Sequence, residues 1–106
     1  MSYGDEALFN MGQTVHHRMF GYRGVVFDVD PIFMGNDQWY EVMAKSRPPK
    51  DRPWYHVLVH GEEHTTYVAQ GNLELDETGE MIAHPLIEEV FRGHENGVYV
   101  LRQSLS

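Results

Sequence analysis

Two aspartates stand at alternate positions in the segment Asp28-Val29-Asp30-Pro31. In a strand, alternate residues share a face, so their carboxylates would lie about 6.6 Å apart. Paired carboxylates can carry out acid–base catalysis or hold a hard cation. Polar strand faces and Asp-Pro turns give the same pattern without such a function, and this simpler interpretation is the one that we expect.

Seven histidines are the other candidates for metal or proton chemistry. His56, His60 and His64 are spaced by four in a segment typical of strands, where His56 and His60 would lie about 13 Å apart. His64 would return across a hairpin, and the neighbours His16 and His17 would point to opposite faces. Because a metal site needs three or four converging ligands, we predict no metal and no cofactor.

The sequence offers no nucleophile in a catalytic setting. It has no cysteine, which excludes disulfides, thiolate metal sites and a cysteine nucleophile. Its serines lie near the termini or in a proline-rich loop, and no G-x-S-x-G, P-loop or dinucleotide motif occurs. We therefore predict no catalytic residues and no enzyme; a small metal-dependent enzyme using the histidines with Asp28 and Asp30 is the minor alternative.

A basic loop at residues 45–53 stands out in an acidic chain. The formal net charge is −8 at pH 7, so the chain as a whole should repel phosphate backbones. Trp39, Trp54 and Tyr55 flank the loop, and basic groups interleaved with aromatic ones can bind nucleic acid. A solvated loop that offsets the acidic body is the simpler interpretation. The candidate DNA or phosphate contacts are Arg18, Arg23, Lys45, Arg47, Lys50 and Arg52.

Short strands must position these side chains. Period-two alternation over residues 22–30 predicts a half-buried strand, in which Gly21 and Gly24 mark a bulge or a close backbone approach. Residues 72–80 are typical of an acidic loop. The other predicted elements are strands over 13–18, 54–60, 64–69 and 98–101, a hairpin loop over 61–63, a short helix capped by Asp37, and a short helix over 86–92 followed by Gly93.

The length of 106 residues fits a single small domain spanning residues 1–106. Four or five short strands with two brief helices predict a mainly β fold, which we expect to be a small SH3-like antiparallel β-barrel. Side chains fill the interior of such a barrel, which favours a binding surface over an enclosed active site. No window approaches the ~18 apolar residues of a membrane span and no secretory signal is visible, so we expect no membrane association and a cytoplasmic location.

Three sequence patterns occur together in the strand-rich part of the chain. They are G-Y-x-G-V-V-x-D-V-D-P over residues 21–31, P-W-Y-H-V over 53–57 and H-T-x-Y-V-A over 64–69. In this combination the chain resembles the HspQ / YccV-like family, the hemimethylated DNA-binding protein family, over about residues 9–75. The acidic loop, short helix and tail over residues 76–106 lie outside the strong match.

The resemblance implies the SH3-like β-barrel again and a choice of two functions. Family members are described as heat-shock proteins that bind hemimethylated DNA, and as factors that assist degradation of denatured proteins and of the replication initiator DnaA by the Lon protease. We expect the second function: a non-enzymatic stress-response factor that contacts a protease and its clients. Hemimethylated DNA binding is the alternative.

Peptides can add to an exposed sheet edge through main-chain hydrogen bonds, so we expect protein partners and self-association as a homo-oligomer. The predicted partner-binding residues are Trp54, Tyr55, His56, Tyr67 and Tyr22.

Overall fold

The computed structural model describes residues 6–102. These residues form seven strands in two antiparallel sheets, together with two short α-helices and one turn of 3-10 helix. In chain order the elements are β1 (Thr14–His17), β2 (Arg23–Asp30), α1 (Asp37–Met43), β3 (Trp54–Val59), β4 (Thr65–Ala69), η1 (Gln70–Asn72), β5 (Leu73–Leu75), α2 (Ile87–Val90), β6 (Phe91–Glu95) and β7 (Val98–Leu101).

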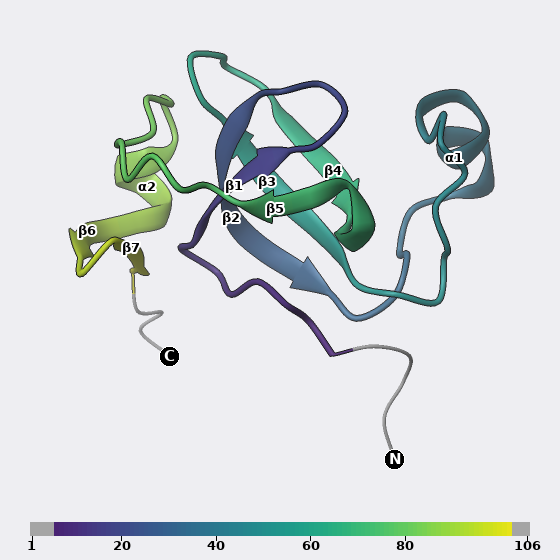
Figure 1. The fold of residues 1–106 in the computed structure, drawn as a ribbon, viewed down its shortest axis with the longest axis horizontal. Helices are drawn as coiled ribbons and strands as arrows, with labels where there is room; N and C mark the ends of the chain where they lie inside the picture. Colours follow the sequence, from purple (N-terminus) through teal and green to yellow (C-terminus); the bar gives the residue numbers. More distant parts are fainter. Residues whose placement is uncertain (1–5, 103–106) are drawn as a thin grey trace.

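The main sheet has five strands in the order β4-β3-β2-β1-β5, and every neighbouring pair is antiparallel (Figure 1). Strands β4 and β5 are its edges, and no pairing between them closes the described strands into a barrel. The mainly β fold is therefore confirmed, whereas the SH3-like barrel is not. No helix within residues 6–102 has the length and apolar character needed to cross a lipid bilayer.

The first half of strand β2 is buried on both faces, not on one as its alternation predicted. Val26 packs with Tyr55 in a cluster on one face of the sheet. Val25, its neighbour, packs with Phe91 and Tyr99 on the other face. Figure 1 shows α2, β6 and β7 together at one end of the sheet, so this C-terminal unit covers a face that the sequence pattern left open.

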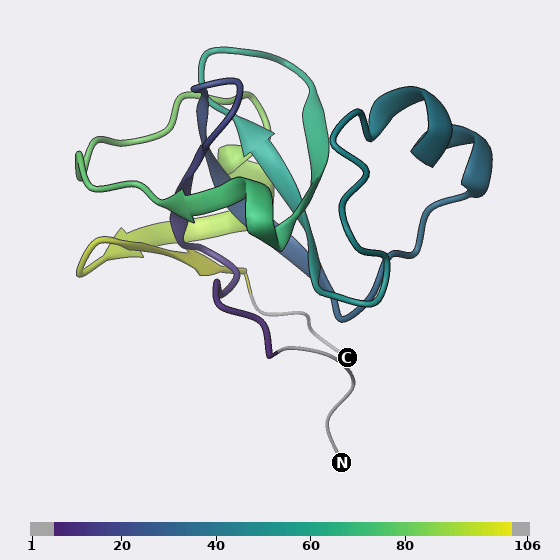
Figure 2. The same cartoon turned by 45° about the vertical axis from the view of Figure 1, so that its right-hand side comes forward.

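A third cluster lies at the opposite end of the sheet, where α1 stands beside β3 and β4 (Figure 2). Tyr40 of α1 packs there against the fully buried Trp54. The helix begins as predicted, but its cap is one residue earlier than Asp37: Asn36 Oδ1 accepts a hydrogen bond from the Trp39 backbone N–H at 2.7 Å.

The predicted helix over residues 86–92 is shorter than expected. Helix α2 ends at Val90, and β6 begins at Phe91, so Gly93 lies in a strand and does not terminate the helix. Phe91 is buried against the main sheet and pairs with Leu101 in the two-stranded sheet formed by β6 and β7. Burial of this aromatic ring therefore overrides the local helical pattern.

The acidic segment over residues 72–80 is only partly a loop. Its first part forms β5, which pairs with β1 and buries Leu73. The connection between β3 and β4 spans residues 60–64, so it is longer than the predicted hairpin loop over residues 61–63.

Gly24 is a point of close backbone approach, one of the two roles predicted for it. A Cβ atom there would lie 2.4 Å from Val57 Cγ1 and 2.5 Å from the Leu58 carbonyl oxygen. The bulge lies elsewhere in β2: the register shifts between Val26 and Asp28.

Candidate functional site

Two of the predicted contact residues lie in the core. Trp54 is 1% exposed and Tyr55 is 0% exposed. Trp54 Nε1 donates to the Pro49 carbonyl at 3.1 Å, and the Tyr55 hydroxyl donates to Gln70. The expectation that these two rings lie on an exposed strand is wrong, because β3 is a central strand covered on both faces. His56, Tyr67 and Tyr22 are half-buried and reach the surface.

An apolar groove runs beside the edge strand β4. Its larger part encloses about 290 Å³, and a narrower part continues toward the basic loop. Two of its apolar side chains are unusually exposed for their type, Phe20 at 69% and Met43 at 60%. The residues common to both parts of the groove are Phe20, Trp39, Met43, Tyr67 and Val68.

His17 shapes the turn that carries Phe20 into the groove. Its Nδ1 accepts hydrogen bonds from the backbone N–H groups of Met19 and Phe20, both at 3.1 Å. Its ring also stacks on Phe20 with centroids 4.6 Å apart. Burial lowers the pKa of His17, and the neighbouring His16 lowers it further, so the imidazole stays neutral and keeps an acceptor nitrogen.

Aromatic packing fixes the other wall of the groove. Trp39 of α1 lies edge-on to Tyr67 of β4, with centroids 5.7 Å apart, and edge-on to the buried Trp54 at 6.1 Å. Tyr22 and Thr66 join their hydroxyls at 2.8 Å beside the same strand. Such ring contacts hold α1 at a fixed distance from β4, so the groove is formed before any partner binds.

The strand beside this groove has one free edge within the described sheet, since β4 pairs only with β3. An unpaired edge presents main-chain donors and acceptors to an incoming strand. Together with the apolar walls, this edge suits an extended peptide with apolar side chains.

The predicted basic surface is largely neutralised by its own neighbours. Arg47 Nη1 lies 2.7 Å from Glu41 Oε2, and Lys50 Nζ lies 3.2 Å from Asp37 Oδ1. The Lys50 ammonium also lies 4.3 Å from the centre of the Tyr40 ring. Arg52 Nε lies 3.9 Å from Asp51 Oδ1, so three of the four loop cations have carboxylate partners within residues 37–52.

The remaining candidate DNA contacts do not gather in one place. Arg23 binds Asp76 at the other end of β2. Arg18 and Arg52 line a shared hollow that also contains acidic side chains. Lys45 lies at the narrow end of the apolar groove. These cations are spread over three parts of the surface, so they form no single basic patch.

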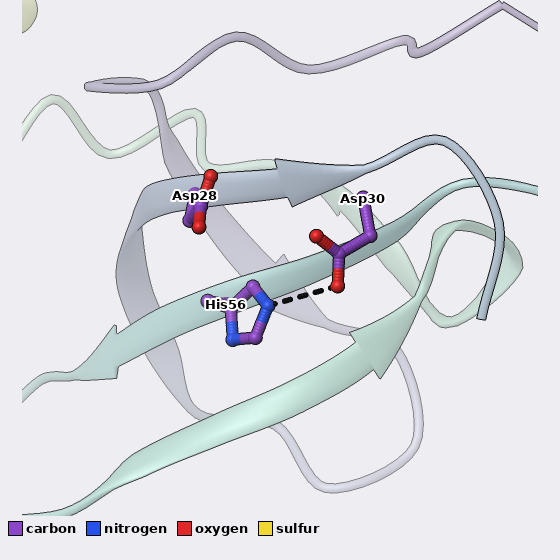
Figure 3. A group of neighbouring side chains, drawn as sticks. All are labelled: Asp28, Asp30 and His56. Atoms are coloured by element: carbon purple, nitrogen blue, oxygen red, sulfur yellow. Dashed lines mark hydrogen bonds and ion pairs between the residues drawn. The ribbon is translucent and has the colours of Figure 1, made fainter. Parts of the chain in front are cut away.

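A second candidate site lies across the neighbouring strands β2 and β3. Asp28, Asp30 and His56 each offer an atom within 4.8 Å of the other two (Figure 3). His56 Nε2 lies 3.1 Å from Asp30 Oδ2, and the Tyr67 hydroxyl donates to the same oxygen at 2.6 Å. Burial raises the pKa of Tyr67, and the hydrogen bond to Asp30 raises it further, so the phenol keeps its proton.

The bulge in β2 produces this arrangement. Because the register shifts between Val26 and Asp28, Asp28 lies directly opposite His56, and Asp30 lies opposite Trp54. Sequence reasoning placed the two aspartates on one face and combined them with the histidines only in the minor alternative of a metal-dependent enzyme, without singling out His56. His56 lies close to the two aspartates because of the β2–β3 register. That register could not be predicted, because no sequence feature near Val26–Asp28 was recognised as a bulge.

A family model matches most of the chain. The model described as "YccV-like: Hemimethylated DNA-binding protein YccV like" matches residues 7–98. The match includes α2 and β6 and reaches the first residue of β7, so it extends well beyond the 9–75 resemblance.

Proposed function

The chain belongs to the YccV-like family, and we propose that it is a non-enzymatic factor that binds extended, apolar segments of other proteins. Its clients would be denatured or regulatory proteins such as DnaA, and a Lon-type protease would receive them during stress. The observation that carries this proposal is the apolar groove along the free edge of β4.

The groove provides two independent sources of affinity. A bound segment would cover Phe20 and Met43, and full burial of such a side chain contributes about 1.5–3 kcal/mol. It would also form main-chain hydrogen bonds to β4, and these do not depend on the amino-acid sequence of the bound segment. A site of this kind binds many clients weakly, as a factor that delivers unfolded chains to a protease requires.

The charge of the chain supports protein clients over polyanions. A formal net charge of −8 repels phosphate backbones, and the loop cations Arg47 and Lys50 already have carboxylate partners. A phosphate contact at Arg47 or Lys50 would have to replace the ion pair of that residue.

The test compares two substitutions on one helix. Met43→Ser removes a groove side chain, whereas Val42→Ser removes an apolar side chain that is 57% exposed and lies outside the groove lining. Binding of a fluorescent peptide with alternating apolar residues should weaken about tenfold in Met43→Ser, equal to 1.4 kcal/mol, and stay unchanged in Val42→Ser. Equal binding by both variants would refute the groove as the site.

A degradation assay then tests the role itself. Purified Lon-type protease and a labelled denatured client are combined with the wild-type chain, with Met43→Ser or with Val42→Ser. The proposal expects faster client degradation with the wild type and Val42→Ser and little acceleration with Met43→Ser. No acceleration by the wild-type chain at any ratio would overturn the delivery role.

The description of the matching family model favours a second candidate, binding of hemimethylated DNA. It would require affinity that falls steeply with salt and that distinguishes hemimethylated from fully methylated and unmethylated duplexes. Gel-shift titrations of the three duplexes at two salt concentrations test it. Equal binding that vanishes near physiological salt would leave protein clients as the function.

A further inference from the structure

We propose that Asp28, Asp30 and His56, on strands β2 and β3, form a binding site for one divalent transition-metal ion. The site is separate from the client groove, because none of the three side chains lines that groove. Its position follows from cross-strand register rather than from any sequence motif.

The three ligands converge from two adjacent strands (Figure 3). Asp28 and His56 are direct cross-strand partners, and Asp30 follows Asp28 by two positions, on the same face. Side chains on paired strands are held by the ladder hydrogen bonds beneath them, so the ligand positions need little rearrangement to bind an ion.

Outer contacts orient the ligand groups. The Tyr67 hydroxyl donates to Asp30 Oδ2 at 2.6 Å and accepts a hydrogen bond from the Met34 N–H at 2.9 Å. The rings of Tyr67 and Phe27 contact the His56 imidazole, with centroid separations of 4.5 and 5.8 Å. Hydrogen bonds to ligating carboxylates and confinement of ligating imidazoles are the usual supports of protein metal sites.

The charge of the site also favours a cation. Within residues 6–102, His56 is the only side chain that forms an ion pair with either aspartate, and it is a cation only when protonated. Two carboxylates therefore share at most one positive charge. A divalent ion would supply the missing charge, with the Nε2 atom of neutral His56 as a ligand.

The ligand set indicates the class of ion. Two carboxylates and one imidazole suit Mn²⁺, Fe²⁺, Co²⁺ or Zn²⁺, whereas Ca²⁺ prefers six to eight oxygen ligands. Asp28 is exposed, so water can complete the coordination from the solvent side. Such a site on a rigid sheet would stabilise the fold by joining β2 to β3.

Mn²⁺ is a suitable probe, used with the full-length chain carrying no histidine tag. Titration followed by electron paramagnetic resonance gives stoichiometry and affinity, and Mn²⁺ broadening of amide NMR signals gives the location. The variants are Asp28→Asn and His56→Gln. The matched control is His16→Gln, because His16 also pairs with one carboxylate, Glu74, at 2.8 Å on another part of the sheet.

We expect one Mn²⁺ per chain, broadening centred on Asp28, Asp30 and His56, and competition by Zn²⁺. Either site variant should raise the dissociation constant at least about tenfold, and His16→Gln should leave it unchanged. Far-ultraviolet circular dichroism checks the folding of each variant, and the exposed Asp28 keeps the test decisive if His56→Gln misfolds. Failure of Mn²⁺ to saturate the wild type, or equal binding by Asp28→Asn and the wild type, would overturn the proposal.

Discussion

The guanidinium of Arg23 lies 2.8 Å from the carboxylate of Asp76, and this ion pair joins the start of β2 to the segment that follows β5. The Asp76 side chain is 3% exposed, and Arg23 also donates to the Glu80 carbonyl. Arg23 was a candidate DNA contact from sequence. In the structure its charge holds the segment after the edge strand β5 against the start of the interior strand β2.

Asp76→Asn should destabilise the fold by about 3 kcal/mol, the lower end of the cost of breaking a buried ion pair. Urea unfolding at neutral pH measures this loss. The matched control is Glu80→Gln, whose carboxylate lies 4.0 Å from Arg23 and is 76% exposed, and which should change the stability by under about 0.5 kcal/mol. Equal losses in the two variants would contradict the assignment.

The same pair contributes a stability that depends on acid. Burial acts to raise the pKa of Asp76, but hydrogen bonds from Arg23 and Thr78 outweigh it, and the pKa lies below its ordinary value. As the pH falls through the ordinary pKa of an aspartate, the unfolded chain therefore protonates Asp76 before the folded chain does. The free energy of unfolding decreases over this range until the pH is below the folded-state pKa of Asp76. The difference in stability between the wild type and Asp76→Asn should narrow across this acidic range.

Gly24→Ala should cost about 3 kcal/mol, because its Cβ would meet backbone and side-chain atoms of β3 at 2.4 and 2.5 Å. Thermal unfolding compares it with Gly71→Ala, whose Cβ would meet nothing within 4 Å. A stable Gly24→Ala chain would show that β2 and β3 can separate at this point.

His17→Asn should flatten part of the pH dependence of stability. The folded-state pKa of His17 lies below the ordinary value of 6.5, so the unfolded state binds the proton first as the pH falls through that value. Wild-type stability is full above it and falls until the pH passes the lowered pKa. Asparagine keeps an acceptor atom but does not titrate. Unfolding in urea from pH 7.5 to pH 5 measures the difference, with the exposed His64→Asn as control.

Phe91→Ala should destabilise the protein by about 3–5 kcal/mol, since Phe91 is 2% exposed and packs against β2 and β3 through Val25 and Leu58. Met81→Ala removes an exposed apolar side chain from the segment that precedes α2 and should cost far less. Similar unfolding midpoints for the two variants would mean that the β6–β7 pair is not part of the core.

The strands were predictable where the sequence itself carries the alternation or the β-branched content. The predicted strands at β1, β2, β3, β4 and β7 agree with the structure to within a residue or so at each end. Strand β5 was missed because three residues, Leu73–Leu75, are too few to show a period. The helix over 86–92 was too long because Phe91 is drawn into a strand by packing that only the tertiary structure creates.

The candidate sites depend on relationships between segments, and these were harder to predict. His56 and Asp28 were each recognised as chemically capable, but their meeting requires a register set by the bulge in β2. Trp54 and Tyr55 were expected at the surface because the coverage of β3 by two separate units was unknown. Self-association remains a prediction, which sedimentation velocity can measure.

The contact of Phe91 and Tyr99 with Val25 and Leu58 sets an order of events during protein synthesis. The ribosome synthesises β2 and β3 early. The sheet face that carries Val25 and Leu58 nevertheless stays exposed to solvent until β6 and β7 have left the exit tunnel. A nascent chain stalled before β7 would therefore present an uncovered apolar sheet to chaperones and proteases. Until β7 has emerged, the nascent chain therefore exposes the same kind of apolar surface as the denatured clients that we propose it binds.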